Sequence, residues 1–497
     1  MKKLIFTFAV IFAITLAAQE PEQKIWVKSR SISWTEQVPD KPLLKVFDAA
    51  HRSNPRQNIM LSPWGIQQCF GMLTGWAPKL HSAQLNAVLG LNMHDRYDLR
   101  NARLALQKTQ AEFNSFNAVL FDRQYTLKQP FIQDVNYFFG GKMYRLDLTR
   151  KKECAMVLNG IIKRESRNMF DNVFAPQDFA NDPMMILLNV LYFKANWFNS
   201  FEEHLTKKER FMTPAASNFE AIHHSRVDMM NDEKYVPYYN DGIIHGIILD
   251  YADDRFKMLV LTTVKMPSSL KTVTGNLARK GVLHFIRNSS DHNKTIIKLP
   301  KLKLESRLDL KSLLSSVGLT SIFDPRGSLR MIQNSDAVYI DSARQVVKLS
   351  LDETGTEVAA VTIALPKAAA IRPQAVKYNK FYADHPFVLV LFDSKTGAIL
   401  LTAAIVHPEE NEKTETYILG NRYSFDNWFG FVLFRICRNA FYRETVGGRN
   451  RGRLSGFSGE SGKYSLSIGQ RLLFEVRKAH LSQNSVILVY LVSGQAV

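Results

Sequence analysis

Residues 351–371 read LDETGTEVAAVTIALPKAAAI. The stretch begins with acidic residues, contains a single glycine, Gly355, and carries no charge between Glu357 and Lys367. Its β-branched residues favour an extended backbone, and in a strand alternate residues share a face. One face would be small and uncharged, formed by Thr356, Val358, Ala360, Thr362 and Ala364. Pro366 then interrupts regular structure. Taken alone, the stretch predicts an ordinary buried strand or an alanine-rich helix.

The N-terminus has the layout of a secretory signal peptide. Lys2 and Lys3 precede an apolar run from Leu4 to Leu16, and small residues follow. This pattern predicts a signal peptide over residues 1–18, and the run is too short for a membrane span. We therefore expect a secreted, extracellular protein with no membrane span.

The composition indicates a large buried core. Of 497 residues, 46% are hydrophobic and 22% are charged. Length alone allows about three average domains, a prior that one large domain can override. The three cysteines are too few for a disulfide framework, and their odd number leaves at least one thiol unpaired within the chain. Asn288 and Asn293 begin glycosylation sequons in a polar stretch that suits an exposed loop.

The chain is strongly basic, with a formal net charge of +18. Nucleic acid is the usual partner of such a chain, but a secreted protein does not meet it, and we expect no nucleic-acid partner. Extracellular polyanions such as glycosaminoglycans are the more relevant partners. Dispersed charge that serves only solubility is the alternative. The densest basic segments are 149–152, 206–210 and 443–453.

Helix patterns dominate the first half of the chain and strand patterns the second. Ser62 stands before Pro63 as the cap of a buried helix, and DLKSLLSSVGL (309–319) reads as a capped amphipathic helix. MMILLNVLYFKANWF (184–198) is a nearly continuous apolar run that suits a central strand. The order predicts an α+β architecture, with no internal linker before about residue 409.

Enzyme motifs are missing from the sequence. It contains no HExxH, GxSxG or paired CxxC pattern. We therefore predict that the protein is not an enzyme and has neither a metal site nor a cofactor.

Five segments together resemble the serpins, a family of serine protease inhibitors, in a secreted and insect-like form. They occur in serpin order and at near-serpin spacing: NIMLSP (58–63), LNVLYFKANWFNSF (188–201), IIKLPKLKLES (296–306), DETGTEVAAVT (352–362) and ADHPFVLVLF (383–392). The resemblance implies a serpin domain over residues 19–409. Its fold would have three β-sheets, eight to nine helices and an exposed reactive-centre loop at about 353–380. Residues 410–497 would be a poorly ordered C-terminal extension, serving partner binding or surface anchoring or reflecting translation past the usual stop.

In such proteins the loop is bait for a protease and then inserts as a new strand into the main sheet. The resemblance therefore implies a suicide-type inhibitor that traps an extracellular serine protease covalently. The implied hinge of the loop consists of Glu353, Gly355, Thr356, Glu357, Val358, Ala359 and Ala360. Gly355 would supply conformational freedom. Glu357 would lie on the opposite face from Thr356, where its charge need not be buried.

The resemblance also assigns residues to the main sheet. Trp197 and the pair Lys301 and Glu353 match the breach, the end of the sheet where the loop enters. Ser62 and Asn189 match the shutter, under the centre of the sheet.

The reactive bond can be counted in two ways. Counting from Glu353 gives Ala369–Ala370 and an elastase-like protease. Counting back from Pro386 gives a later site. Lys367 is the alternative that suits a trypsin-like protease.

The chain also departs from the usual serpin pattern. Gly65 replaces a serine and Gln345 a histidine at the shutter, while Ala195 and Ala403 replace glycines and Val358 replaces a hinge alanine. The segment between about residues 80 and 116 is shorter than usual, which argues against the helix that many serpins use to bind heparin. One alternative to an inhibitor is a non-inhibitory serpin that acts as a carrier or extracellular binding protein. A second is a glycosaminoglycan-tethered interaction protein in which the fold is only a scaffold.

Overall fold

The computed structural model describes residues 40–408 apart from short gaps, and three strands between residues 463 and 493. The gaps fall at 110, 169, 180–182, 215–221, 254, 266–268, 291–292, 328, 334–337 and 357–377. The chain divides into two compact units, Met1–Ile418 and Leu419–Val497. The predicted signal peptide and most of the predicted loop, including Ala369 and Ala370, lie outside the described residues.

Nine α-helices lie in the described part of the first unit. They are α2 (Asp40–Ser53), α3 (Pro63–Gly71), α4 (Lys79–Leu89), α5 (Arg96–Leu106), α6 (Gln129–Phe139), α7 (Lys151–Glu165), α8 (Leu270–Lys280), α9 (Val282–Arg287) and α10 (Leu310–Ser316). The predicted cap of α3 is confirmed, because the Ser62 hydroxyl accepts a hydrogen bond from the backbone N–H of Gly65. Asp309 caps α10 in the same way.

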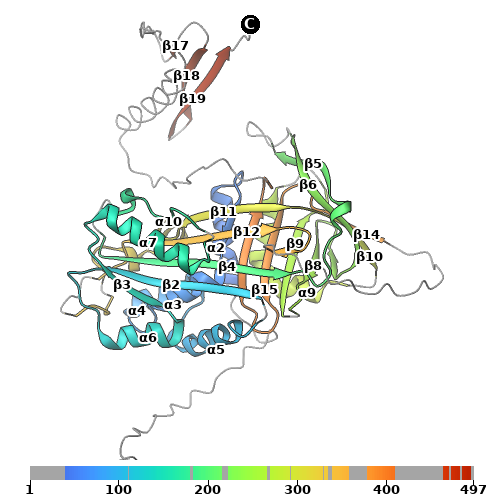
Figure 1. Ribbon diagram of the computed structural model, residues 1–497. Helices are drawn as coiled ribbons and strands as arrows, with labels where there is room; N and C mark the ends of the chain where they lie inside the picture. The colour runs from blue at the N-terminus through green and yellow to red at the C-terminus, as the bar shows by residue number, and fades with distance from the viewer. Residues whose placement is uncertain are drawn as a thin grey trace, which may run out of the picture. The chain divides into compact units, whose positions relative to one another are not determined.

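The central sheet has the strand order β11-β12-β13-β4-β2-β3. Its strands are β2 (Glu112–Asp122), β3 (Lys142–Leu146), β4 (Met185–Asn196), β11 (Leu302–Asp309), β12 (Ser342–Leu351) and the short β13 (Gly355–Thr356). At the end of the sheet away from β13, which we call its lower end, β12 and β4 also pair directly. This pairing is parallel and joins Ser342–Val347 to Ile186–Leu191. Figure 1 shows these two long strands running side by side.

Two further sheets complete the first unit. One has the order β1-β16-β15-β9-β8-β7 and the other the order β14-β10-β6-β5. The strands are β1 (Ile59–Leu61), β16 (Ile399–Ile405), β15 (Phe387–Asp393), β9 (Phe256–Thr263), β8 (Ile244–Asp250), β7 (Tyr238–Asn240), β14 (Tyr378–Tyr382), β10 (Lys294–Pro300), β6 (Ile222–Tyr235) and β5 (Lys207–Pro214).

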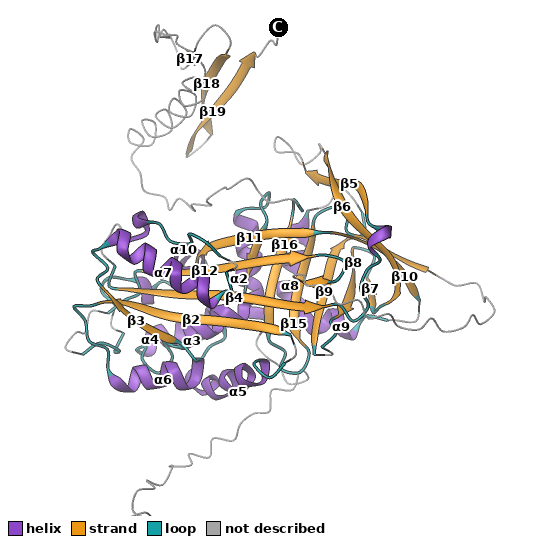
Figure 2. Cartoon of the chain, in the orientation of Figure 1, coloured by secondary structure: helices purple, strands orange, loops and turns teal. Residues whose placement is uncertain are grey.

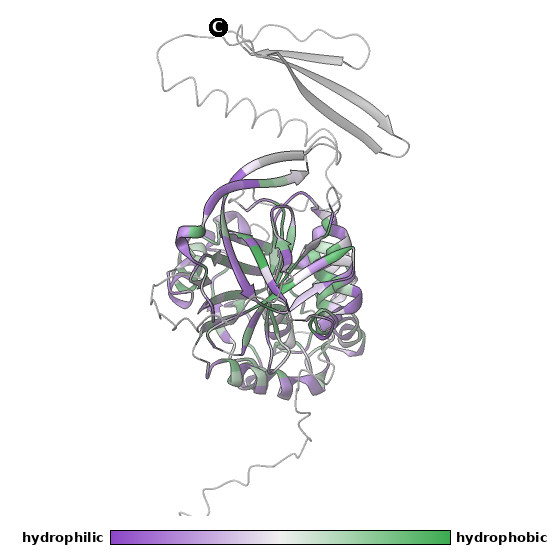
Figure 3. Cartoon of the chain, turned by 90° about the vertical axis from the view of Figure 1, so that its right-hand side faces the viewer, coloured by the Kyte–Doolittle hydropathy of each residue, from purple (hydrophilic) through white to green (hydrophobic). Residues whose placement is uncertain are grey.

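The central sheet is buried on both faces. On one face α7 packs Leu158 and Ile162 into a cluster with Val190 of β4 and Val346 of β12. Figure 2 shows α7 lying across this side of the sheet. The opposite face belongs to the main core, to which α3 contributes Trp64 and other apolar residues. In Figure 3 the apolar colouring gathers on the strands inside this body.

The second unit contains an antiparallel sheet of three strands. They are β17 (Lys463–Ile468), β18 (Leu472–Leu481) and β19 (Asn484–Ser493), in the order β17-β18-β19. The apolar run SVILVYLV (485–492) lies in β19.

The expected α+β fold with three sheets and eight to nine helices is confirmed in the described part of the first unit. The run at 184–198 forms the predicted central strand, β4. The segment between about residues 80 and 116, although shorter than usual for a serpin, contains most of α4 and all of α5. α5 forms there because Leu99, Ala102 and Leu106 recur at helical spacing and become buried. Among the described residues, no helix combines the length and apolar character needed to cross a membrane.

Candidate functional site

The start of the predicted loop forms a strand inside the central sheet. Thr356 of β13 pairs with Leu351 of β12 on one side and with Ala195 of β4 on the other. Asp352 closes the tight turn between β12 and β13, since its Oδ1 accepts hydrogen bonds from the backbone N–H groups of Thr354 and Gly355. The first part of the hinge therefore separates β4 from β12 at this end of the sheet.

Gly355 occupies a place where no side chain fits. A Cβ atom added there would lie 2.2 Å from the carbonyl oxygen of Ala195 and 2.6 Å from the Cα of Asn196. Its φ angle is not in the left-handed region. In this state glycine is required by close backbone approach, in addition to the freedom expected from the sequence.

Thr356 is held by an aromatic pair beneath the sheet. Its side chain is buried, and its hydroxyl lies 2.7 Å from the hydroxyl of Tyr251. The Tyr251 ring stacks on Trp197 with centroids 4.5 Å apart. The Trp197 indole N–H donates to the carbonyl of Asp352, and its backbone N–H donates to the carbonyl of Thr354. The breach tryptophan thus fixes the turn from which the hinge starts.

The ion pair expected from the sequence is present at the breach. Lys301 Nζ lies 2.8 Å from Glu353 Oε2, and the Thr206 hydroxyl donates to Glu353 Oε1 at 2.7 Å. The Glu353 side chain is 8% exposed and that of Lys301 41%. Burial by itself raises the pKa of Glu353, but the hydrogen bonds from Lys301 and Thr206 outweigh it and hold the pKa below its ordinary value.

The shutter is a buried chain of polar side chains that links α3, β12, β4 and β2. The Gln345 side chain accepts from the backbone N–H of Ser62 at 2.7 Å and donates to the backbone carbonyl of Ser62 at 3.0 Å. It also donates to Asn189 Oδ1 at 2.9 Å, and Asn189 donates to Asn117 Oδ1 at 2.8 Å. Gln345 therefore serves as the polar bridge across the seam between β12 and β4.

Gly65 makes room for this arrangement. A Cβ atom at residue 65 would lie 2.1 Å from Asn189 Oδ1. The two departures from the serpin pattern are therefore linked, because the glycine leaves space for the amide that Gln345 binds.

The structure brings all the predicted breach and shutter residues into these two clusters. Asn117, Tyr251 and Thr206 were missed by the sequence analysis. Asn117 had no distinct signal, because β2 also carries the polar residues Glu112, Asn114 and Ser115 before it. Tyr251 and Thr206 had none. The hinge residues Glu357, Val358, Ala359 and Ala360, with Lys367, lie outside the described residues.

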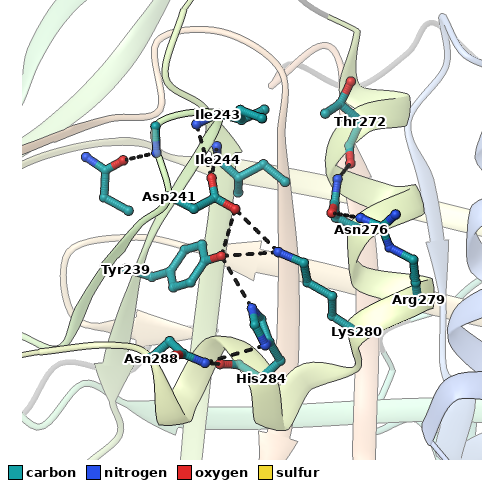
Figure 4. A network of polar contacts seen from close by, with 12 residues as sticks. Tyr239, Asp241, Ile243, Ile244, Thr272, Asn276, Arg279, Lys280, His284 and Asn288 are labelled. Atoms are coloured by element: carbon teal, nitrogen blue, oxygen red, sulfur yellow. Dashed lines mark hydrogen bonds and ion pairs between the residues drawn. The ribbon is translucent and has the colours of Figure 1, made fainter.

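The two sequons differ in exposure. Asn288 is exposed just after α9, whereas Asn293 is half-buried at the entry to β10. Figure 4 shows Asn288 beside His284, to whose carbonyl oxygen its side-chain amide donates at 2.7 Å. A glycosylated asparagine keeps one amide N–H, which suffices for this bond.

The arginines of α5 face α6. Arg96 Nη1 lies 3.0 Å from Asp134, Arg103 donates to the carbonyls of Tyr137 and Phe138, and Arg100 lies over the Tyr137 ring. These cations are already engaged within the molecule. In the described part of the chain, no cluster of three or more histidine, cysteine or acidic residues is arranged to hold a metal ion.

Comparison with known proteins is consistent with this geometry. A family model described as Serpin (serine protease inhibitor) matches residues 43–408. Glia-derived nexin of Rattus norvegicus is 23% identical over 410 residues, covering 81% of this chain and 99% of that protein. Neuroserpin of Homo sapiens is 24% identical over 389 residues, covering 74% and 90%.

Solved structures agree in fold. The structure of native protease nexin-1 with heparin has a TM-score of 0.64 at 22% identity, covering 74% of this chain and 97% of that one. Human thyroxine-binding globulin has a TM-score of 0.65 at 18% identity, covering 75% and 97%.

Proposed function

The chain belongs to the serpin family, and on that premise we propose that it is a secreted inhibitor of serine endopeptidases that acts as a suicide substrate. Members of this family are protease inhibitors, and the chain is not an enzyme. The proposal is carried by one observation: β13, the first part of the hinge, already lies between β4 and β12.

The register of β13 defines how the rest of the loop would insert. Thr356 pairs with Ala195 of β4 and with Leu351 of β12, and both pairings are antiparallel. Each further loop residue would therefore pair with the preceding residue in the sequence of β4 and of β12. Continued in this way, Thr362 meets Asn189 on one side and Gln345 on the other. Asn189 and Gln345 are themselves partners in the direct pairing of the two strands. The pairings of β13 with β4, of β13 with β12 and of β4 with β12 therefore agree on one register.

The two faces of the inserted strand would suit their surroundings. The side chain of Thr356 points into the main core, so Val358, Ala360, Thr362 and Ala364 would follow it there. Val361, Ile363 and Leu365 would lie on the other face. That face is covered by α7, where Val190 and Val346 form an apolar cluster. The larger apolar residues would thus be buried beneath α7.

The same register bears on the reactive bond. Pro366 would lie opposite Met185, the first residue of β4. Ala369 would then lie beyond the lower end of the sheet. Cleavage at Ala369–Ala370, or after Lys367, would leave enough loop to fill the seam and carry an attached protease from one end of the sheet to the other.

A gel-shift experiment tests this function. The protein is incubated with elastase-like and trypsin-like serine proteases, and we expect an SDS-resistant covalent complex with one class. Mass spectrometry of the released peptide locates the reactive bond. Cleavage of the loop without any complex would contradict the proposal and favour a non-inhibitory carrier.

Secretion, glycosylation and polyanion binding belong to the same proposal. The signal-peptide pattern over residues 1–18 supports secretion, and the exposure of Asn288 supports glycosylation there. Protease nexin-1, a structural relative, has been solved with heparin. Together with the net charge of +18, this supports a glycosaminoglycan as partner. Heparin should then accelerate inhibition in a salt-sensitive way, and an unchanged rate at low salt would favour dispersed charge.

A further inference from the structure

The hairpin of β5 and β6 carries most of the basic segment 206–210, one of the densest in the chain. β5 is the edge strand of its sheet, and Lys207, Lys208 and Arg210 in its first half are exposed. Figure 1 shows the two strands extending from the body of the first unit. A ligand could therefore reach this hairpin without any rearrangement of the fold.

Two arginines lie directly opposite each other in the hairpin. Arg210 of β5 pairs with Arg226 of β6 in an antiparallel register. Both are exposed, and they point away from the core because their neighbours Phe211 and Val227 are buried on the other face. Directly opposite residues have Cβ atoms roughly 4.5–5.5 Å apart, and like charges in this position destabilise the pairing of the strands. The hairpin therefore holds these two positive charges at a cost.

Nothing in the described part of the chain offsets this cost, because no carboxylate there forms an ion pair with Arg210 or Arg226. The next pair along the hairpin differs, since Lys208 lies opposite Asp228 and its Nζ is 3.1 Å from Asp228 Oδ2. The arginines of α5 also differ, because they contact a carboxylate, a ring and carbonyls of α6. The two opposed guanidinium groups are thus left available for an anion from outside the chain.

We propose that Arg210 and Arg226 together bind one sulfate group of a glycosaminoglycan. Each guanidinium group can donate charge-assisted hydrogen bonds to sulfate oxygens, and an anion between the two groups removes their repulsion. The ion pair with Lys208 reduces the repulsion that the Asp228 carboxylate would exert on the bound polysaccharide. The inference rests on the proposed glycosaminoglycan partner, and it names the residues that hold that partner.

Heparin binding by the full-length protein tests the site. Wild type, Arg210→Gln, Arg226→Gln and the double variant are each titrated with heparin and with fully desulfated heparin at low salt. Arg287→Gln is the matched control, because Arg287 is an exposed arginine at the end of α9 and the same charge is removed. The urea unfolding midpoint of each protein is measured without heparin.

We expect each single variant of the pair to weaken heparin binding by about tenfold, as the loss of a hydrogen bond to a charged group does. The double variant should bind only slightly more weakly than either single variant, because one sulfate group needs both arginines. Arg287→Gln should bind heparin nearly as wild type does. Without heparin, the single variants of the pair should unfold at a slightly higher urea concentration, because the repulsion is relieved.

Equal losses of heparin affinity in Arg226→Gln and Arg287→Gln would show dispersed charge and overturn the site. A fully additive loss in the double variant would overturn the shared sulfate, and a lowered urea midpoint would overturn the repulsion on which the site depends. Wild type that binds heparin no better than the desulfated polymer would overturn both the site and the proposed partner. Absence of the covalent complex in the gel shift would overturn inhibition alone, because heparin binding is measured without a protease.

Discussion

The two ends of the seam between β4 and β12 are built differently. At the breach, β13 already separates the strands, and Trp197, Tyr251 and Glu353 hold it there. At the lower end, Ser342–Val347 of β12 pair directly with β4, and the Gln345 side chain bridges the two strands at the shutter. One end has accepted the first residues of the loop, and the other is closed.

This difference indicates where the resistance to insertion lies. The upper contacts need not break, because the inserted strand would keep the pairing that Thr356 already makes. Insertion of each further loop residue must break hydrogen bonds between β4 and β12. At the shutter it must also break the hydrogen bond between the side chains of Gln345 and Asn189. We therefore expect a protein trapped kinetically in its free state by the lower half of the seam.

The largest expected effect comes from opening the seam completely. Cleavage within residues 366–372 should raise the stability of the molecule by more than a point substitution changes it, which is about 0.5–3 kcal/mol. The reason is that a full central strand is added and the lower seam becomes a continuous sheet. Thermal unfolding of cleaved and uncleaved protein measures this, and equal melting temperatures would remove the inhibitory mechanism.

The next effect concerns Ala360, which the register would bring opposite Leu191 and Val347, on the side of the main core. Ala360→Arg should leave folding and the first protease encounter almost unchanged. During insertion it would have to bury an unpaired guanidinium, at a cost of about several kcal/mol. The protein should turn from inhibitor into substrate.

Ala359→Arg is the matched control for Ala360→Arg. It would point to the other face, opposite Tyr192 and Lys348, and should be much milder. The ratio of covalent complex to cleaved serpin is the measurement. Equal inhibition by the two variants would mean that the register is wrong or that the loop does not insert.

Gly355→Ala should open the upper end of the seam in the free protein. The new Cβ would overlap the Ala195 carbonyl, and overpacking of this kind costs about 1–3 kcal/mol. We expect β13 to leave the sheet, which frees the Trp197 N–H from the Thr354 carbonyl. Faster hydrogen exchange at Trp197 would report this, and unchanged exchange would show that the hinge tolerates the methyl group.

Gly65→Ala should lower the stability of the lower half of the sheet, where β4 and β12 pair directly. The Cβ displaces Asn189 and breaks its bond with Gln345, and an unsatisfied buried amide costs about 1–3 kcal/mol. Gly160→Ala in α7 is the control, because a Cβ there meets nothing within 4 Å and alanine favours a helix by up to about 1 kcal/mol. Opposite shifts of the urea midpoint are expected, and shifts of the same sign would contradict this account of the shutter.

The smallest effect concerns pH. The folded-state pKa of Glu353 is depressed, so its ion pair adds stability above its ordinary pKa of 4.5 and loses it as pH falls through the folded value. Because Lys301 is partly exposed, the contribution should be about 1 kcal/mol or less. Glu353→Gln should lower stability at pH 7, and the loss should become smaller as pH falls below 4.5. A loss that stays the same from pH 7 down through the acid range would exclude the ion pair as the cause.

Much of the fold was predictable from the sequence because its signals are local. Ser62 before Pro63 and the apolar run of β4 each specify an element within a few residues. The breach and shutter residues were identified through resemblance and not through spacing. Tyr251 and Thr206 were missed because their partners lie far away in the chain, and nothing in their neighbourhood marks them. The insertion of Thr356 in the free protein could not be predicted, because it depends on how closely β12 and β4 approach each other.

The pairing of β1 with β16 has a consequence for biosynthesis. Ile59–Leu61 hydrogen-bonds to Thr402–Ala404, so this sheet cannot be completed until the end of the domain has been made. At about 5–20 residues per second, the ribosome needs roughly 20–70 s to cover that distance. During this time the apolar edge of β1 has no partner, which makes folding slow and exposes the nascent chain to aggregation. The rate of chain synthesis therefore sets a lower limit on the time in which this sheet can be completed.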